Sequence, residues 1–232
     1  MPVSTQLLAR FALLQPLSGE ALEPLSRAMS LREFARREVV VAKENTLMEL
    51  GFLVEGRLQG VDFTVDGRSV GLYFVDPGDY FGELPLVDGK PSAEHVVAAV
   101  KSVVAFLDAR AARDLILNNP ALAQAVMARL AQRVREGLAQ RTLLSLPNPF
   151  QRLCALLLQL PASSLQGVAT IEQAPTHQEL AIMINSSRET VTRAFQVLFA
   201  HSMLVRDGNS LRIEKAVLLQ DIAQGRADPP KA

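Results

Sequence analysis

Cysteine, tryptophan and histidine are scarce in this chain of 232 residues, which has one cysteine, no tryptophan and three histidines. The single Cys154 excludes a disulfide within the chain, and one thiol does not suffice for an iron–sulfur cluster or a cysteine-rich zinc site. The histidines lie far apart in the sequence, and no Ser/His/Asp, metal or phosphate-loop pattern accompanies them. We therefore expect a reducing compartment, no bound metal and no enzymatic activity.

Long apolar runs and a net charge are also absent. No uninterrupted hydrophobic stretch reaches the roughly 20 residues that span a membrane, and the first residues carry no basic leader. Lys and Arg number 24, as do Asp and Glu, and from Phe150 onward eight cations accompany seven anions, which leaves 8 − 7 = +1. We expect a soluble cytoplasmic protein without membrane contact. Its attraction to nucleic acid depends on where its cations lie and on a dimer that presents two sets of them.

One segment of eighteen residues, 176–193, reads as two short helices joined by a tight polar turn. Thr176 and Glu179 are spaced as a capping box, which predicts the start of the first helix. Asn185 tolerates the left-handed conformation that a sharp turn requires, and Ser187 is suited to cap the second helix. This order and spacing are typical of a DNA-binding helix-turn-helix.

The second of these helices has a buried side and an exposed side. Helical spacing places Thr192 and the trio Arg188, Glu189 and Arg193 on the exposed side. Arginine can donate two hydrogen bonds to guanine and a carboxylate can accept one from cytosine, so we predict that the trio reads bases. The alternative is that the arginines are solvated surface charges and that Glu189 closes a capping box with Ser186. The residues predicted to be buried are Val191, Ala194, Phe195 and Leu198.

The run Ser187-Arg188-Glu189-Thr190-Val191-x-Arg193 resembles the helix-turn-helix of the Crp/Fnr family of transcription regulators, in its cyclic AMP receptor branch. The resemblance implies that the trio contacts a TGTGA-type half-site. Residues 204–213 contain two strand-like runs around an Asp-Gly turn, which predicts a hairpin of the kind called a wing, although a plain surface hairpin fits as well. Weaker candidates for contacts with the DNA backbone are Thr176, Gln178, Ser187, Thr190, Arg206 and Arg212.

The front half of the chain consists of short strand-like runs separated by Gly, Asp and Pro. These runs lie at 38–41, 51–54, 70–75 and 103–107, and residues 5–29 read as helices that precede them. The pattern predicts an antiparallel roll or barrel, with an all-β sandwich as the alternative. The segments 53–56 (LVEG), 77–83 (PGDYFGE) and 107–108 (LD) resemble the framework of a cyclic-nucleotide-binding roll.

The presumed pocket departs from the family pattern. Gly82 and Glu83 match the Gly-Glu pair that holds the ribose, but the expected phosphate-binding Arg-Ser falls on Ala93 and Glu94, and the adenine-contacting Thr-Ser falls on 137–138 (Gly-Leu). A carboxylate repels a phosphate unless Lys90 or His95 bends in, so cyclic AMP is disfavoured. The predicted pocket residues are Gly82, Glu83, Leu84, Ala93, Glu94 and Arg133.

Two possibilities for the pocket stay open at the level of sequence. The pocket binds cyclic di-GMP or another nucleotide, as some relatives do, or it is degenerate and structural. Haem bound through His95 is disfavoured because no second ligand is identifiable. An iron–sulfur cluster is excluded by the cysteine count.

Between residues 118 and 144 apolar residues recur every four positions, which predicts a long amphipathic helix. Such a stripe can pack on its own domain, but the resemblance implies a coiled coil between two subunits. Gly137 weakens this helix midway, and the sequence Pro147-Asn148-Pro149 ends it and caps the next one. The predicted dimer residues are Val126, Leu130, Val134 and Leu138.

Together these patterns predict an α+β chain with an N-terminal cyclic-nucleotide-binding-type β-roll, a long dimerisation helix and a C-terminal winged helix-turn-helix. The expected segments are a sensor at 1–117, the dimer helix at 118–146, a hinge at 147–149, the DNA-binding domain at 150–218 and a tail at 219–232. We expect a homodimeric regulator that binds double-stranded DNA and RNA polymerase. The alternative is a nucleotide-binding scaffold module whose helix-turn-helix contacts protein.

Overall fold

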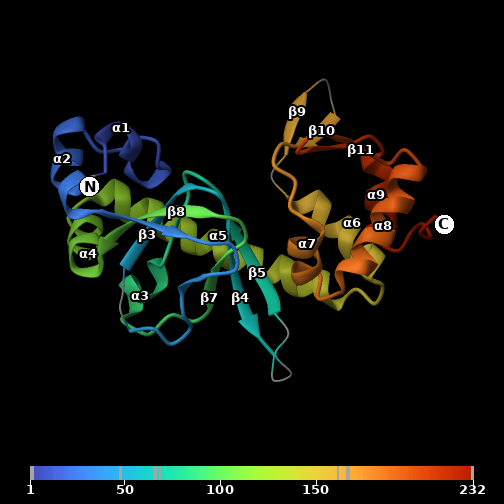
Figure 1. The fold of residues 1–232 in the computed structure, drawn as a ribbon, viewed down its shortest axis with the longest axis horizontal. Coiled ribbons are helices and arrows are strands. Elements are labelled where there is room, and N and C mark those ends of the chain that lie inside the picture. The colour runs from blue at the N-terminus through green and yellow to red at the C-terminus, as the bar shows by residue number, and fades with distance from the viewer. Residues whose placement is uncertain are drawn as a thin grey trace. The chain divides into compact units, whose positions relative to one another are not determined.

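The computed structural model describes residues 3–46, 49–64, 67, 69–160, 162–165 and 168–230 (Figure 1). Contacts between residues divide the chain into two compact units. The first comprises Met1–Phe63 and Leu72–Gly137, and the second comprises Thr64–Gly71 and Leu138–Ala232. The long helix α5 (Pro120–Ser145) therefore contributes to both units, and each unit is described by itself.

The first unit begins with short helices, as the sequence predicted for residues 5–29. These are α1 (Thr5–Leu8), the 3₁₀ helix η1 (Ala12–Leu14) and α2 (Gly19–Ala28). The Ser4 hydroxyl accepts a hydrogen bond from the Leu7 amide at 3.2 Å, which fixes the start of α1. Their apolar faces bury Leu8, Phe11 and Leu22 against the strands that follow.

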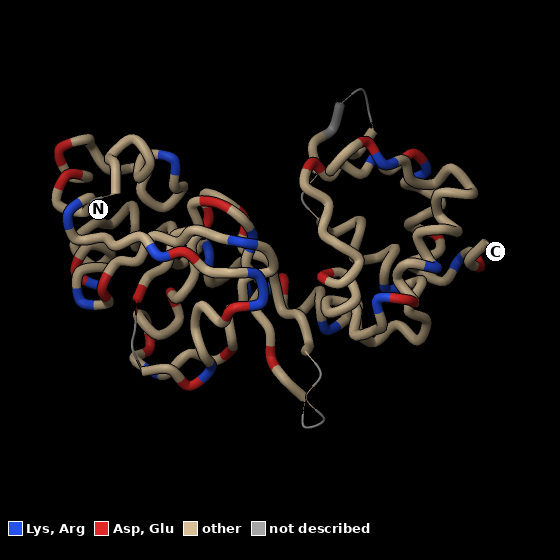
Figure 2. The backbone as a smooth tube through the Cα atoms, viewed as in Figure 1, with Lys and Arg blue, Asp and Glu red and all other residues tan. Residues whose placement is uncertain are grey.

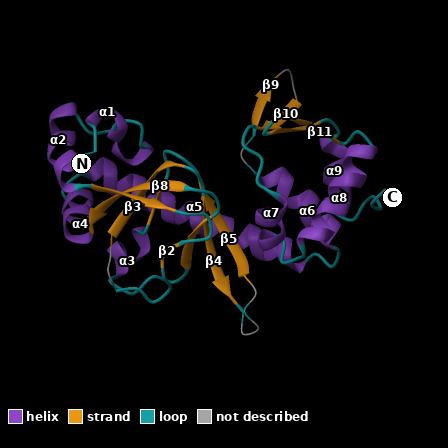
Figure 3. Ribbon diagram, viewed as in Figure 1, coloured by secondary structure: helices purple, strands orange, loops and turns teal. Residues whose placement is uncertain are grey.

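The strands of the first unit form two four-stranded sheets, with the orders β1-β8-β3-β6 and β2-β7-β4-β5 (Figure 3). Neighbours such as β3 and β8 pair antiparallel, with Leu50 opposite Leu107. The predicted antiparallel roll is confirmed. The strands are β1 (Ser30–Phe34), β2 (Val39–Val41), β3 (Glu49–Glu55), β4 (Leu58–Phe63), β5 (Ser69–Val75), β6 (Tyr80–Phe81), β7 (His95–Ala98) and β8 (Ser102–Asp108).

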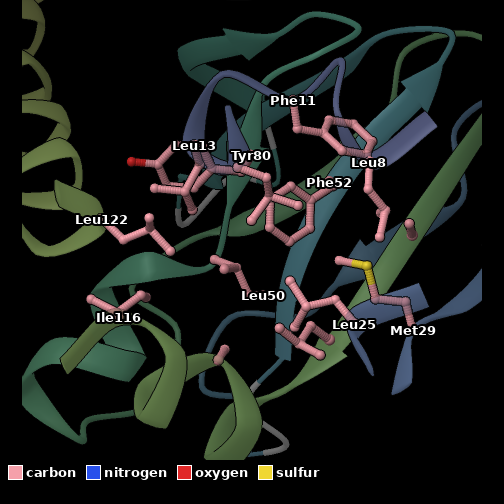
Figure 4. Close-up of a cluster of buried hydrophobic side chains, with 14 of the residues drawn as sticks. Leu8, Phe11, Leu13, Leu25, Met29, Leu50, Phe52, Tyr80, Ile116 and Leu122 are labelled. Atoms are coloured by element: carbon pink, nitrogen blue, oxygen red, sulfur yellow. The ribbon is translucent and has the colours of Figure 1, made fainter. Parts of the chain in front are cut away.

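Two hydrophobic clusters hold this unit together. One lies between the sheet and the helices, where the rings of Phe11 and Phe52 have centroids 5.0 Å apart (Figure 4). The other fills the roll, where Phe81 packs edge-on against Phe106 at 6.1 Å. A Cβ atom on Gly51 would lie 2.3 Å from the Phe81 ring, so the absence of a side chain at this position makes the packing possible.

Three further helices complete the first unit. They are α3 (Glu83–Asp88), α4 (Ala109–Leu117) and the first part of α5. Asp108 caps α4 by accepting a hydrogen bond from the Arg110 amide at 2.9 Å, and Asn119 accepts one from the Ala121 amide at 3.1 Å at the start of α5. Helix α5 runs without a break through Gly137, so the expected weak point does not interrupt it.

The prediction for the apolar stripe of α5 was wrong for two of its four residues. The four-residue spacing placed Val126 and Leu130 at a dimer seam, but Val126 is buried in the core of its own unit and Leu130 packs against the same core. Val134 and Leu138 remain 64% and 60% exposed. A helix has 3.6 residues per turn, so a stripe of period four drifts around it, and the early members of the stripe face inward.

The second unit contains the remaining elements of the chain. The helices are α6 (Pro149–Gln159), α7 (His177–Met183), α8 (Arg188–Ala200) and α9 (Ala216–Ala223). The strands β9 (Ser163–Leu165), β10 (Val168–Ile171), β11 (Leu204–Asp207) and β12 (Ser210–Ile213) form a sheet of order β11-β12-β10-β9. The predicted hairpin is confirmed as β11 and β12, with Arg206 opposite Leu211, whereas nothing in the sequence had indicated β9 and β10.

The predicted junction after the long helix has the expected local structure. Asn148 accepts a hydrogen bond from the Phe150 amide at 2.8 Å, and Pro149 occupies the first position of α6. Cys154 is a buried core residue of α6. The predicted tail at 219–232 was wrong at its start, because α9 buries Leu219 and Ile222 and packs against α6.

Candidate functional site

The first helix of the helix-turn-helix begins with the predicted capping box. The Thr176 hydroxyl accepts a hydrogen bond from the Glu179 amide at 3.3 Å, and the Glu179 carboxylate accepts one from the Thr176 amide at 2.6 Å. Both exposed donors at the start of α7 are thereby satisfied. Leu180, Ala181 and Ile184 are buried.

The turn between the two helices also follows the prediction. Asn185 has a φ angle of 48°, in the left-handed region that asparagine tolerates. The Ser186 amide donates to the Ala181 carbonyl at 2.9 Å, and the Ser187 hydroxyl accepts a hydrogen bond from the Thr190 amide at 3.1 Å. Helix α8 therefore starts directly after a capped, tight turn, which fixes where its first residues lie.

Helix α8 presents the predicted trio on its exposed side. Arg188, Glu189 and Arg193 are exposed, whereas the four residues predicted to face inward are all buried. Thr192 does not belong to the exposed set: its hydroxyl donates to the Arg188 carbonyl and contacts the His177 ring nitrogen Nδ1, each at 2.9 Å. The sequence could not show this contact, because it joins two different helices.

Glu189 carries its negative charge between two cations. Its pKa is lowered by a hydrogen bond from its own backbone amide, by the Ser187 side chain and by the nearby Arg188 and Arg193. Ser187, rather than Ser186, is the residue that interacts with it, so the capping box considered with Ser186 is not formed. An ionised carboxylate beside two guanidinium groups offers one hydrogen-bond acceptor and two bidentate donors to base edges.

The candidates for contacts with the DNA backbone differ in how exposed their side chains are and in whether they are already paired. Thr176, Ser187 and Arg206 are exposed, whereas Gln178 and Thr190 are half-buried. Arg212 is 47% exposed and forms an ion pair with Glu214 at 2.8 Å, so part of its charge is already neutralised. Lys and Arg are interspersed with Asp and Glu along both units (Figure 2). Any attraction to phosphate is therefore local.

His177 connects the two helices of the motif. Its ring stacks on Phe195 with centroids 4.6 Å apart and an interplanar angle of 11°. Its pKa is lowered, first by burial and then by the positive charges of Arg206 and Arg188. The unfolded chain therefore takes up this proton more readily than the folded one, and stability is lost as the pH falls below the ordinary histidine pKa of about 6.5.

We expect His177→Gln to weaken this pH dependence. Between about pH 7.5 and about pH 5.5, the wild-type chain should lose more of its free energy of unfolding than the variant does. Urea unfolding at the two pH values measures the difference, and His201→Gln, at an exposed position, is the matched control. Equal losses in the wild type and His177→Gln would contradict the account.

The roll contains a cavity of ≈ 120 Å³ beside the start of α3. Five of the six predicted pocket residues line it, namely Gly82, Glu83, Leu84, Ala93 and Glu94. The cavity is smaller than the roughly 300 Å³ at the lower end of typical ligand pockets. Its wall also carries Glu49 and Arg32, which pair with each other and which the sequence gave no reason to select.

Arg133, the sixth predicted residue, does not line the cavity but contacts two carboxylates that do. Its Nε atom lies 3.0 Å from Glu83 Oε1, and its Nη1 atom lies 3.9 Å from Glu94 Oε1. Its guanidinium carbon lies 3.5 Å from the centroid of the Tyr73 ring, and the Tyr73 hydroxyl donates to Glu94 at 2.6 Å. Sequence reasoning missed Tyr73, whose only signal was an aromatic residue within a strand.

The other groups considered for this pocket are engaged or lie at the surface. His95 Nδ1 accepts a hydrogen bond from the Lys43 amide at 3.2 Å, and its ring packs edge-on against Phe63. Lys90 is exposed. Among the described residues, no group of three His, Cys, Asp or Glu side chains is arranged to hold a metal ion.

Gly82 shapes the entrance to α3 and positions Glu83. Its φ angle is +88°, and an added Cβ would lie 2.5 Å from the Glu49 carbonyl oxygen. We expect Gly82→Ala to lower the free energy of unfolding by at least about 1–3 kcal/mol. Gly89 is the matched control, because its φ is +71° but nothing lies within 4 Å of its Cβ position. Equal losses in Gly89→Ala and Gly82→Ala, measured by urea unfolding, would contradict the steric argument.

Within the described part of the chain, every helix is too short or too polar to cross a bilayer.

Comparisons with known proteins agree with both halves of this architecture. A cyclic nucleotide-binding domain model matches residues 31–119, and a Crp-like helix-turn-helix domain model matches residues 151–222. The CRP-like cAMP-activated global transcriptional regulator of Mycobacterium tuberculosis is 26% identical over 212 residues, which cover 90% of this chain and 94% of that protein. The Cyclic AMP receptor protein of Thermus thermophilus is 31% identical over 156 residues, 67% of this chain and 70% of that protein.

A solved structure shows the same fold. A transcriptional regulator of the CRP family from Thermus thermophilus superposes with a TM-score of 0.62 at 25% identity, covering 87% of this chain and all of that one. The two matching domain models together span most of the chain, and their order is that of the roll and the helix-turn-helix described above. The fold and the resemblance read from the sequence are thus confirmed, and the chain belongs to the Crp/Fnr family of DNA-binding transcription regulators.

Proposed function

We propose that this regulator works as a homodimer that reads a palindrome with TGTGA-like half-sites through Arg188, Glu189 and Arg193. The observation that carries the proposal is the exposed trio on the first turns of α8, directly after a capped turn. Guanine and cytosine edges are complementary to two guanidinium groups and one ionised carboxylate. The proposal also draws on the resemblance of this run to the receptor branch of the family.

The dimer is proposed from a different face of α5 than the sequence indicated. Met127, Ala131, Val134 and Leu138 are all exposed, and their spacings of four, three and four residues form a heptad seam. Arg129 and Arg133, on other positions of the helix, are bonded to the roll. The seam is therefore apolar and exposed within the subunit, which suits pairing with the same helix of a second copy.

A two-fold dimer presents two recognition helices to half-sites about one helical turn apart. A dimer also doubles the small positive charge of the C-terminal half, from +1 to +2. RNA polymerase is the further partner that we propose for a regulator of this kind. The alternative is a scaffold role, in which the helix-turn-helix contacts protein. The residues that would support it are the same ones that the proposed regulator uses to contact DNA.

The roll is of the nucleotide-binding type, but its pocket does not fit cyclic AMP in the receptor manner. In the part of the chain that the structure describes, three carboxylates line the cavity: Glu94 in the segment expected to bind the phosphate, Glu83 at the position expected to hold the ribose, and Glu49. A phosphate would lose hydration there, and Arg32, an arginine of the cavity wall, is already bonded to Glu49. We propose that cyclic AMP is not an effector of this chain, and that a nucleotide such as cyclic di-GMP acts only if it avoids these carboxylates.

The test is a titration of labelled duplexes with the purified full-length protein, followed by fluorescence anisotropy at several salt concentrations. We expect a TGTGA-containing palindrome to bind at least about a thousandfold more tightly than a scrambled duplex of equal length. Affinity for both duplexes should fall as salt rises, because phosphate contacts release counterions. Equal binding of the scrambled duplex would overturn the proposed function.

A further inference from the structure

One buried glutamine near the end of α5 donates both hydrogens of its side-chain amide to backbone carbonyls. Gln140 is 8% exposed, and its Nε2 atom lies 2.7 Å from the Met183 carbonyl oxygen and 3.2 Å from the Gly71 carbonyl oxygen. Gly71 and Met183 are also buried, and all three residues belong to the second unit. An amide nitrogen carries two hydrogens, so the donor capacity of Gln140 is fully used.

The Met183 carbonyl stands at the end of α7, where a helix leaves its last four carbonyls without partners inside the helix. The carbonyls of residues 180–182 accept hydrogen bonds from the amides of residues 184–186, within the helix-turn-helix itself. The Met183 carbonyl accepts its hydrogen bond from Gln140, 43 residues earlier in the chain. The end of α7, directly before the tight turn that leads into α8, is therefore held by the long helix.

Gln140 lies on the face of α5 opposite the proposed seam. Leu138, the last residue of the seam, is 60% exposed. Gln140 follows two residues later, which is about 200° around a helix of 3.6 residues per turn. Leu143, three residues after Gln140 and therefore on the same face, is buried. The end of α5 thus carries the seam on one side and the contact with the helix-turn-helix on the other.

Removal of the Gln140 amide would take the donor away from two buried carbonyls. A buried acceptor without its donor is costly, because water does not replace the lost hydrogen bond. The end of α7 would then be able to shift relative to the end of α5, whereas the exposed trio of α8 would keep its chemistry. Base reading and the attachment of α7 to the dimer helix therefore depend on different residues.

We propose that Gln140 is a positioning residue that ties the helix-turn-helix to the dimer helix and thereby sets the half-site spacing that the dimer accepts. The inference rests on the proposed function, since it concerns a dimer on a palindrome. A dimer binds half-sites at the separation that its own geometry imposes. A firm attachment of each helix-turn-helix to the seam makes that separation strict, and a loose attachment makes it permissive.

The first arm of the test measures the attachment without DNA, by hydrogen exchange of backbone amides in the full-length protein. Gln140→Met keeps an unbranched side chain but removes both donors, and Gln132→Met makes the same change at an exposed position of α5. We expect peptides that cover residues 180–187 to exchange at least about fivefold faster in Gln140→Met, because local opening then breaks one hydrogen bond fewer. Gln132→Met should match the wild type. Unchanged exchange in Gln140→Met would overturn the proposal.

The second arm measures the Kd of palindromes whose half-sites are unchanged but whose spacer is longer or shorter by two base pairs. We expect the wild type and Gln132→Met to lose at least about a hundredfold in affinity, because the two half-sites are then no longer bound at once. Gln140→Met should lose about tenfold or less, since a looser attachment still reaches both half-sites. A change that only destabilised the fold would weaken binding at every spacer length alike. Circular dichroism and the dimer mass of each variant exclude unfolding as the cause.

Gln140→Glu is a second variant of equal size, whose carboxylate accepts but does not donate hydrogen bonds. It should tolerate changed spacers at least as well as Gln140→Met. Two results of the second arm would overturn the proposal: a wild type that binds all spacer lengths equally well, or variants at position 140 that keep the spacing preference of the wild type. Failure of the proposed function is recognised separately, because the wild type would then not prefer the palindrome to the scrambled duplex. In that case the exchange arm still decides whether Gln140 holds the end of α7.

Discussion

Val134→Glu is expected to sediment as a monomer and to bind the palindromic operator about 10²- to 10⁴-fold more weakly than the wild type. Val134 is 64% exposed within one subunit and lies in the middle of the proposed seam of α5. A glutamate from each subunit would place two like charges in a dry interface. A dimer binds both half-sites at once, so its second recognition helix is held close to the second half-site. A monomer lacks this advantage, which accounts for the large loss of affinity.

Gln132→Glu is the matched control for this prediction. It also adds one negative charge to an exposed position of α5, two residues away, but lies outside the seam. Analytical ultracentrifugation should find a dimer for Gln132→Glu, with operator affinity close to that of the wild type. A Val134→Glu variant that remains dimeric would place the subunit interface elsewhere.

Arg188→Ala combined with Arg193→Ala is expected to remove most of the preference for the operator. Each bidentate arginine–guanine contact is worth about 1–3 kcal/mol of discrimination. If the two changes are additive, they together correspond to about 30- to about 3 × 10⁴-fold in affinity per half-site. Both side chains are exposed, so the variant should fold normally. Binding to scrambled DNA, which depends on phosphate contacts, should change far less.

Arg110→Ala controls for the simple loss of a positive charge. Arg110 is exposed on α4 in the other unit, far from the helix-turn-helix in sequence. Anisotropy titrations should show unchanged discrimination for Arg110→Ala. If the double variant loses affinity for operator and scrambled duplex to the same extent, the arginines contact phosphates and the base-reading role is wrong.

The helix-turn-helix could be predicted from the sequence because its signals are local. The capping box of Thr176 and Glu179, the left-handed Asn185 and the Ser187 cap each involve residues at most three positions apart. Hydrogen bonds over such short separations depend little on the rest of the fold. The start of each helix, the turn between them and the exposed trio therefore followed from residue types and spacing alone.

The contacts around Arg133 were beyond the reach of the sequence because they join distant segments. Arg133, Tyr73 and Glu94 come from a helix, a strand and a loop, and no periodicity relates them. The sequence did indicate that Ala93 and Glu94 stand where the phosphate-binding Arg-Ser is expected. It also indicated Arg133 as a pocket residue, but not that this guanidinium contacts Glu83, Glu94 and Tyr73.

The predicted seam of α5 was wrong at Val126 and Leu130 for a geometric reason. A four-residue repeat and a heptad seam share Val134 and Leu138, and only the packing of Val126 into the core distinguishes them. The short strands β9 and β10 were missed because three or four residues carry too little pattern to stand out. Both errors concern tertiary context rather than local preference.

The proposed function requires Arg188 to read one particular base pair of each half-site. The most direct measurement is the affinity of the wild type and of Arg188→Ala for a set of palindromes in which each half-site position is changed in turn. The account predicts that Arg188→Ala loses discrimination at a single G·C position, by about 1–3 kcal/mol, and keeps it at the others. A uniform loss of affinity across all the palindromes would contradict it.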